Sequence, residues 1–203
     1  MTRRLRLLAA ALLVVAGTAA ADVQPETVGR NVPLPSTRGP HWFWLSDMLL
    51  HRTALFDGDS GMLLGSITSG SPGVGFVISP LFSADRREIY LAESYYARGI
   101  RGARTDVVTI YDGSSLKPVT EIGIPPKRAE YYPGNAANAL TDDGRFMAVF
   151  NVTPATSISI VDLRERRFVI ELPTPGCSLV YGAGPRRFFT VRLLIAAAAV
   201  TSV

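Results

Sequence analysis

Histidine and cysteine are nearly absent from this chain of 203 residues, which has two histidines and one cysteine. Neither His41 nor His51 stands at a metal-ligand spacing from an acidic residue or from the cysteine. No Gly-x-Ser-x-Gly motif marks a nucleophilic serine. The single cysteine, Cys177, excludes a disulfide within the chain. We therefore expect no catalytic residue, no metal ligand and no cofactor-binding residue here.

Long amphipathic helical patterns are also missing, and so are basic runs interleaved with aromatic residues. The formal charge of +4 comes largely from the N-terminal segment and from arginines between Arg98 and Arg104, which gives no support to nucleic acid binding. The glycine-rich stretch Gly70–Gly75 lacks a following helix or lysine, so we expect a loop and no phosphate site. Residues 57–61 lack the bidentate glutamate of a calcium loop and are expected to form a turn.

The first 21 residues have the three-part layout of a secretory signal peptide. Arginines near the start precede an uncharged run over Leu7–Ala16, and small residues follow. That run is shorter than the roughly 20 residues that a spanning helix needs, although an N-terminal membrane anchor remains the alternative. We expect cleavage before Asp22, a periplasmic mature chain, and no membrane span after cleavage.

Short apolar stretches separated by Gly, Asp, Ser or Pro dominate the chain from residue 45 onward, and this pattern is typical of strands. Three stretches read as strand, Asp-led turn, strand, with their aspartates at Asp57, Asp112 and Asp162. A second element, in which a polar turn precedes an apolar strand, alternates with the first at Phe82–Tyr90, Leu140–Met147 and Pro185–Phe189. The repeat interval of about 50 residues is that of a four-stranded β-propeller blade.

We therefore predict an all-β chain with about three blades of a β-propeller over residues 45–190, after an extended segment over residues 22–44. That number cannot close a ring, because closed propellers have ~4 to 8 blades. Residues 191–203 are almost entirely apolar, and we expect an aberrant tail produced by truncation, a frameshift or a sequencing error. Open sheet faces and edges predict poor solubility of the chain alone. A small open β-sandwich is the alternative fold.

The stretch Arg98–Asp112 resembles one that is characteristic of the heavy subunits of methylamine and aromatic amine dehydrogenases. Leu55–Gly61 and Ala139–Arg145 are also similar to that family, although each is generic for propellers. The resemblance covers roughly residues 30–190. It implies a seven-bladed propeller, incomplete at the C-terminus here, that acts as the large, non-catalytic subunit and forms the scaffold and the wall of the substrate channel.

The resemblance also places the cofactor and the reaction in partner proteins. A small, disulfide-rich subunit would carry tryptophan tryptophylquinone and oxidatively deaminate primary amines, and a blue-copper protein would accept the electrons. The two tryptophans, Trp42 and Trp44, do not resemble the cofactor-forming pair. The resemblance implies an aromatic residue in the channel wall, and the candidates are Trp42, Phe43 and Trp44.

The family implies a disulfide from the cysteine after a Pro-rich turn to a second cysteine beyond a Phe-Phe strand. Cys177 follows such a turn, and Phe188-Phe189 is present, but no cysteine follows. Cys177 is thus a disulfide candidate that lacks its partner. In an oxidising compartment an odd thiol invites intermolecular pairing.

Arginine and tyrosine gather just before the Asp-led turn at Asp112. Both residue types are enriched at the cores of protein interfaces, so this stretch is a candidate docking site for the small subunit. The candidate interface residues are Tyr95, Tyr96, Arg98, Arg101 and Arg104. The alternative is a solvated loop whose arginines pair with local carboxylates. Two other functions also remain open: a periplasmic propeller that only binds, without enzymatic activity, and a propeller hydrolase with a metal ring.

Overall fold

The computed structural model describes residues 33–35, 37–47, 49–71, 80–130, 135–192 and 198–202. The expected signal peptide lies outside these residues, as does the glycine-rich stretch after Ser71. Strands dominate the described part of the chain, and its one helical element is the short 3-10 helix η1 (Asn135–Ala137). None of the helical structure in these ranges is long and apolar enough to span a membrane.

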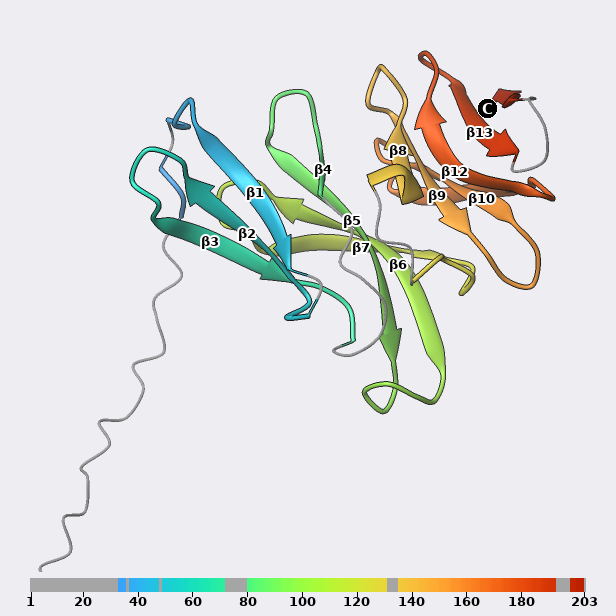
Figure 1. The fold of residues 1–203 in the computed structure, drawn as a ribbon, viewed down its shortest axis with the longest axis horizontal. Helices are drawn as coiled ribbons and strands as arrows, with labels where there is room; N and C mark the ends of the chain where they lie inside the picture. Colours follow the sequence, from blue (N-terminus) through green and yellow to red (C-terminus); the bar gives the residue numbers. More distant parts are fainter. Residues whose placement is uncertain are drawn as a thin grey trace, which may run out of the picture. The chain divides into compact units, whose positions relative to one another are not determined.

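The described strands form four antiparallel sheets in chain order (Figure 1). The first sheet contains β1 (Trp42–Asp47), β2 (Arg52–Asp57) and β3 (Leu63–Thr68). The second contains β4 (Leu81–Phe82), β5 (Glu88–Tyr96), β6 (Arg104–Asp112) and β7 (Pro118–Ile124). The third contains β8 (Asn138–Leu140), β9 (Phe146–Asn151), β10 (Ser157–Asp162) and β11 (Arg167–Pro173). The fourth contains β12 (Cys177–Gly182), β13 (Arg187–Arg192) and β14 (Ala198–Ser202).

The three Asp-led turns expected from the sequence have the same internal bonding in three sheets. Each aspartate ends a strand, and its carboxylate accepts backbone N–H groups from the residues two and three positions later. The fourth residue after each aspartate has a left-handed backbone, with φ of 72° at Gly61, 57° at Leu116 and 52° at Arg166. The prediction of three equivalent hairpins, β2–β3, β6–β7 and β10–β11, is confirmed.

The polar turns before β5 and β9 are equivalent to each other as well. In the first, the Ser83 hydroxyl donates to Asp85 at 2.7 Å and accepts the backbone N–H of Glu88 at 3.0 Å. The second repeats these two bonds, at 2.6 and 3.0 Å, with Thr141, Asp143 and Phe146. The second sequence element is therefore confirmed as the turn that connects the first and second strands of a sheet.

Strand register shows which strands are equivalent between sheets. The residue that opens β1, β5 or β9 pairs with the aspartate of the following Asp-led turn, as Trp42↔Asp57, Glu88↔Asp112 and Phe146↔Asp162. The first sheet therefore contains the second, third and fourth strands of the repeat, and the described part of the chain adds no first strand to it. The expected three or so repeats correspond to two four-stranded sheets flanked by two three-stranded ones.

Two boundaries differ from those set by the sequence. The first strand begins at Trp42, before the expected start at residue 45, because the aromatic residues that precede Leu45 pair with β2. In the apolar tail over 191–203, β13 extends to Arg192 and residues 198–202 form β14, which pairs with β13. Apolar periodicity missed β14 because its residues, Ala-Ala-Val-Thr-Ser, do not alternate between apolar and polar.

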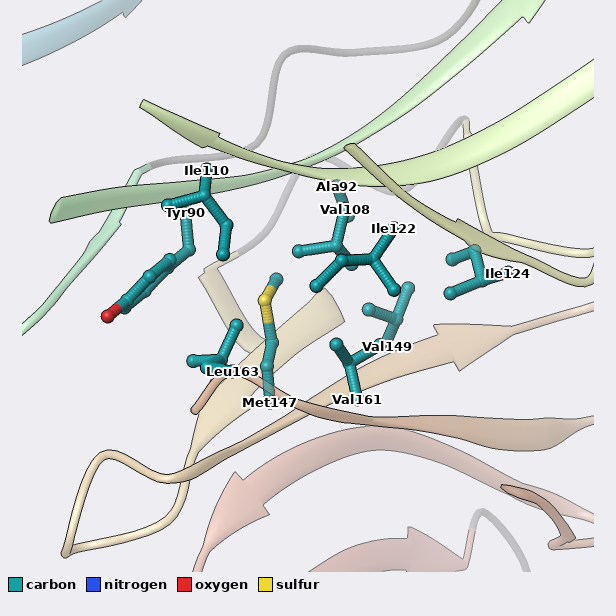
Figure 2. Close-up of a cluster of buried hydrophobic side chains, with 10 residues drawn as sticks. All are labelled: Tyr90, Ala92, Val108, Ile110, Ile122, Ile124, Met147, Val149, Val161 and Leu163. Atoms are coloured by element: carbon teal, nitrogen blue, oxygen red, sulfur yellow. The ribbon is translucent and has the colours of Figure 1, made fainter. Parts of the chain in front are cut away.

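Adjacent sheets pack face to face through separate apolar clusters. Figure 2 shows the cluster between the second and third sheets, which consists of Tyr90, Ala92, Val108, Ile110, Ile122, Ile124, Met147, Val149, Val161 and Leu163. A smaller cluster, between the first and second sheets, contains Ile67, Ile89, Leu91 and Tyr111. Between the third and fourth sheets, Val180 and Phe188 pack on residues that include Phe146, Phe150, Ile158 and Ile160. Both faces of the second and third sheets are thus covered.

We expect the Asp112→Ala substitution to lower the free energy of unfolding by about 1 kcal/mol, because the capped N–H groups lose a charged acceptor. The Asp112 carboxylate accepts the backbone N–H of Ser114 at 3.1 Å and that of Ser115 at 2.7 Å. These bonds, chiefly those from Ser115, hold the pKa of Asp112 below its usual value. Urea unfolding would measure the loss. Ser114→Ala, at an exposed position in the same turn, is the control and is expected to change stability by less than about 0.5 kcal/mol.

Candidate functional site at the β5–β6 hairpin

The longest strands described, β5 and β6, have nine residues each and form a hairpin. Their pairing runs without a break from Glu88↔Asp112 to Tyr96↔Arg104, whereas β7 pairs with β6 only as far as Asp106. The end of the hairpin therefore extends beyond its own sheet, and Figure 1 shows its turn at the lower end of β5 and β6. This end of the hairpin contains every residue of the predicted interface.

The turn between the strands, over residues 97–103, is exposed throughout. Arg98 and Arg101 lie within this turn, and the backbone N–H of Arg98 donates to the Arg101 carbonyl at 2.9 Å. Ile100, between them, is 64% exposed. Neither arginine forms an ion pair with the described residues. The tip of the hairpin thus presents two free guanidinium groups beside an apolar side chain.

Arg104 differs from the arginines at the tip, because two carboxylates hold its guanidinium group. Its Nε and Nη2 atoms donate to the two oxygens of Asp106 at 2.7 and 2.6 Å, and Nη1 donates to Glu130 at 2.9 Å. The Arg104 side chain is 17% exposed and that of Asp106 is fully buried. Burial lowers the pKa of Arg104, but the hydrogen bonds and charges of Asp106 and Glu130 outweigh burial and raise it.

Arg128 completes this network beneath the hairpin. It is 4% exposed, its Nε atom donates to the Ser94 hydroxyl at 3.0 Å, and its backbone N–H donates to Asp106 at 2.9 Å. The Tyr96 hydroxyl donates to Glu130 at 3.0 Å. Burial lowers the pKa of Arg128. Two arginines and two carboxylates therefore balance in charge and fasten the hairpin to the segment that follows β7.

The five residues of the predicted interface thus separate into two groups. Arg98 and Arg101 are exposed at the tip, and docking there stays a prediction. Arg104 and Tyr96 are half-buried at the base, where Arg104 pairs with the local carboxylate of Asp106 and with the more distant Glu130. Tyr95, also half-buried, lies beside Glu93 on the same strand.

Glu93 is a buried carboxyl that the sequence analysis missed. It is 1% exposed, accepts the Tyr111 hydroxyl at 2.9 Å and contacts the hydroxyl of Thr109. Burial raises its pKa above the usual value, although hydrogen bonds from Thr109, Tyr111 and Tyr95 oppose the shift. Burial and the charge of Glu93 also raise the pKa of Tyr95 to about 12. These residues form a polar group on the face of the second sheet that packs against the first.

We expect the pH dependence of stability to report on Glu93. An unfolded chain releases this proton near pH ~4.3, whereas the folded chain keeps it to a higher pH. The free energy of unfolding should therefore fall as the pH rises from that value through the raised pKa, by up to about 1.4 kcal/mol per pH unit. Glu93→Gln should lack this decline. Thermal melts of both proteins between pH 4 and 8 test it, and a pH-independent difference would contradict it.

The other nucleophilic and metal-ligating residues that the structure describes do not gather at a second site. Among the ranges that the structure describes, no three His, Cys, Asp or Glu side chains form a group that could hold a metal ion. The exposed His41 ring pairs with Asp59 at 2.7 Å, in the Asp-led turn that had superficially resembled a calcium loop. Cys177 is a free thiol, 7% exposed, at the start of β12. Its burial disfavours the intermolecular pairing that an exposed thiol would invite.

Comparison with known proteins assigns the family. The methylamine dehydrogenase heavy chain (MADH) family matches residues 48–193. The chain belongs to this family. The heavy chain of Paracoccus versutus is 30% identical over 137 residues, which are 66% of this chain and 31% of that one. The heavy chain of Methylophilus methylotrophus is 24% identical over 198 residues, 90% of this chain and 47% of the other. The chain thus spans less than half of these relatives' length.

Solved structures with a similar fold agree on the architecture. The β-propeller domain of Swd1 from Myceliophteria thermophila has a TM-score of 0.55 at 12% identity, and covers 80% of this chain and 50% of the other. Dihydro-heme d1 dehydrogenase NirN has a TM-score of 0.53 at 21% identity, over 84% of this chain and 37% of the other. At these identities the likeness concerns fold alone. It confirms that the four sheets of this heavy-chain relative are blades of a β-propeller.

Proposed function

We propose that this chain is the large, non-catalytic subunit of a periplasmic amine dehydrogenase that depends on tryptophan tryptophylquinone. The observation that carries the proposal is the family match over residues 48–193, which contains the entire β5–β6 hairpin and its network. The oxidative deamination of a primary amine belongs to the quinone of a small subunit, and a blue-copper protein takes the electrons. This chain supplies a scaffold, a docking surface and part of the wall of the substrate channel.

The tip of the hairpin is the docking surface in this proposal. Arg98 and Arg101 are exposed, flank Ile100 and lack intramolecular carboxylate partners among the described residues. Arginine is among the residue types that dominate binding energy at interfaces. The network at the base supports this role because Arg104, paired with Asp106 and Glu130, fixes the strands that present the tip. A rigid hairpin loses little conformational entropy when its partner binds.

Binding to the small subunit of a methylamine dehydrogenase tests the proposal. We expect the double variant Arg98→Glu/Arg101→Glu to bind the small subunit at least tenfold more weakly than the wild type, because two favourable charges become unfavourable. Arg167→Glu, at an exposed position on β11, is the matched control and should bind as the wild type does. Surface plasmon resonance measures both, and amine-dependent dye reduction by the co-purified complex tests the activity.

Two outcomes would contradict this function. A folded chain that never binds a small subunit would instead support a propeller that acts as a periplasmic binding module. Equal affinities of the double variant and the Arg167→Glu control would remove the hairpin tip from the interface while leaving the subunit assignment intact. Secretion to the periplasm, with cleavage before Asp22, is checked separately by N-terminal sequencing of the exported chain.

A further inference from the structure

A pocket of about 330 Å³ lies between the segment that precedes β1 and the turns at one end of the second sheet. Its lining includes Leu34 and Arg38 of that segment, Trp42 at the start of β1, and Arg86 of the turn before β5. The register pair Glu88↔Asp112 marks this end of the sheet, whereas the β5–β6 turn lies at the other end. The volume suits a small molecule, since ligand pockets range from ~300 to 1,000 Å³.

The backbone of both turns positions Arg38. Its guanidinium group donates through Nη2 to the carbonyl of Gly113 at 3.4 Å and to that of Arg86. The two turns touch each other, because the N–H of Gly113 donates to the Arg87 carbonyl at 2.7 Å. A Cβ atom at Gly113 would lie 2.3 Å from the Arg86 carbonyl oxygen, so only glycine allows this approach. Two backbone carbonyls thus fix the Arg38 guanidinium group beside the turns.

An aromatic ring positions the second arginine, Arg86. Its Cζ atom lies 4.5 Å from the centroid of the Phe82 ring. Because an arginine over a ring uses the face of its guanidinium group, the N–H groups in the guanidinium plane stay available for an acceptor. The pocket therefore contains two guanidinium groups that are each held in place by a neutral partner.

The carboxylates that line the pocket have other partners. Asp85 pairs with Arg87 at 3.3 Å, and Asp112 caps its own turn. Among the residues that the structure describes, neither Arg38 nor Arg86 forms an ion pair. Burial and the positive charge of Arg86 lower the pKa of Arg38, and the charge of Asp85 opposes this shift only in part. The two arginines are thus close enough to repel each other.

Apolar side chains complete the lining of the pocket. Leu34, Pro35 and Trp42 contribute, and Trp42 is one of two tryptophans in the chain. The indole of Trp42 packs against Gly39, where a Cβ atom would lie 2.4 Å from the indole nitrogen. The segment before β1 therefore holds this ring as well as presenting Arg38. A ligand with one anionic part and one apolar part matches such a lining.

We propose that this pocket binds a small organic anion, whose carboxylate or phosphate group pairs with Arg38 and Arg86 and whose apolar part contacts Trp42. Guanidinium groups bind both kinds of oxyanion through paired N–H donors. An anion beside the two arginines offsets their mutual repulsion, so both charges favour the complex. The proposal goes beyond the function proposed above, because it involves neither the β5–β6 turn nor the small subunit.

Isothermal titration calorimetry of the purified chain with phenyl phosphate and with benzoate tests the proposal. We expect saturable binding of at least one, and the tighter of the two identifies the ligand as a phosphate or a carboxylate. Arg38→Gln and Arg86→Gln should each weaken this binding at least about tenfold, because each loses a charge-assisted contact. Arg167→Gln, at an exposed position on β11, is the matched control and should bind as the wild type does. Circular dichroism establishes that each variant is folded, and Arg86→Gln alone decides the test if Arg38→Gln is not.

Two further probes separate the roles of charge and of the apolar wall. Benzylamine carries a similar ring and the opposite charge, and it should bind at least about tenfold more weakly than the preferred anion. Inorganic phosphate lacks the ring and should bind more weakly than phenyl phosphate. Trp42→Ala should remove the difference between these two phosphates, and tryptophan fluorescence of the wild type should change when phenyl phosphate binds, since Trp42 lines the pocket.

Three results would overturn the proposal. Tighter binding of benzylamine than of either organic anion would mean that Asp85 and Asp112 govern the pocket. Equal affinities for phenyl phosphate and inorganic phosphate would mean a site for inorganic anions without an apolar contact. Unchanged affinity in both arginine variants, or no saturable binding of phenyl phosphate or benzoate, would mean that the two guanidinium groups do not form an anion site.

Discussion

Replacing Asp106 with alanine is expected to lower the free energy of unfolding by about 3–5 kcal/mol, the cost of breaking a buried ion pair. The Asp106 side chain is fully buried, and it accepts two bonds from the Arg104 guanidinium group and one from the backbone of Arg128. Without this carboxylate, two arginine side chains of low exposure face only Glu130. The hairpin base is then left with an excess positive charge in a region that water reaches poorly.

An exposed ion pair is the control for this prediction. Arg87→Ala removes the pair between Arg87 and Asp85, whose side chains are 85% and 56% exposed, and should cost less than about 1 kcal/mol. Chemical unfolding of both variants at pH 7 gives the comparison. Hydrogen exchange should show the loss concentrated in β5 and β6, because Asp106 fastens those strands. Equal destabilisation by both variants would show that the network contributes no more than a surface ion pair.

The repeat was predictable because local turn chemistry generates it. Asp57, Asp112 and Asp162 each close a turn with their own backbone neighbours, so the spacing of three aspartates was enough to locate three hairpins. The same reasoning found the turns before β5 and β9. Apolar stretches between these turns then had to be strands, since they lack the 3.6-residue periodicity of amphipathic helices and are too short to span a membrane.

The network at the base of the hairpin could not be predicted in the same way. Arg104 meets Glu130 across 26 residues of sequence and meets the Arg128 carbonyl across 24, and only the path of the chain after β7 brings them together. The sequence alone did not distinguish two roles for the arginines, which were docking of a partner and pairing with local carboxylates. The structure distinguishes Arg104 from Arg98 and Arg101 by burial, which depends on packing between elements and not on residue type.

Glu93 was missed for a related reason. Within Glu88–Tyr96 it is a charged residue, and charged residues are mostly exposed in folded proteins. Both faces of the second sheet are covered, however, so alternation no longer separates the core from the solvent. A carboxyl on such a strand must find donors inside the protein, and the hydroxyls of Thr109 and Tyr111 provide them from the adjacent strand.

Met147→Ala is expected to cost about 2–5 kcal/mol, because it leaves a cavity where the second and third sheets meet. Met147 is fully buried on β9 and lies among side chains of both sheets, with Ile110 and Leu163 nearby in Figure 2. Each contact between successive blades depends on such a cluster, since no covalent link other than the chain joins them. Loss of this side chain should therefore loosen the two central sheets from each other.

A second methionine gives the matched comparison. Met62, just before β3, is 61% exposed, and Met62→Ala should change the free energy of unfolding by less than about 0.5 kcal/mol. Denaturant titrations of the two variants report the difference, and hydrogen exchange shows whether β9 and β10 lose protection together with β5 and β6. If both variants unfolded alike, the packing between blades would not limit stability. A large loss with Met147→Ala alone would identify this cluster as the contact that holds the central sheets together.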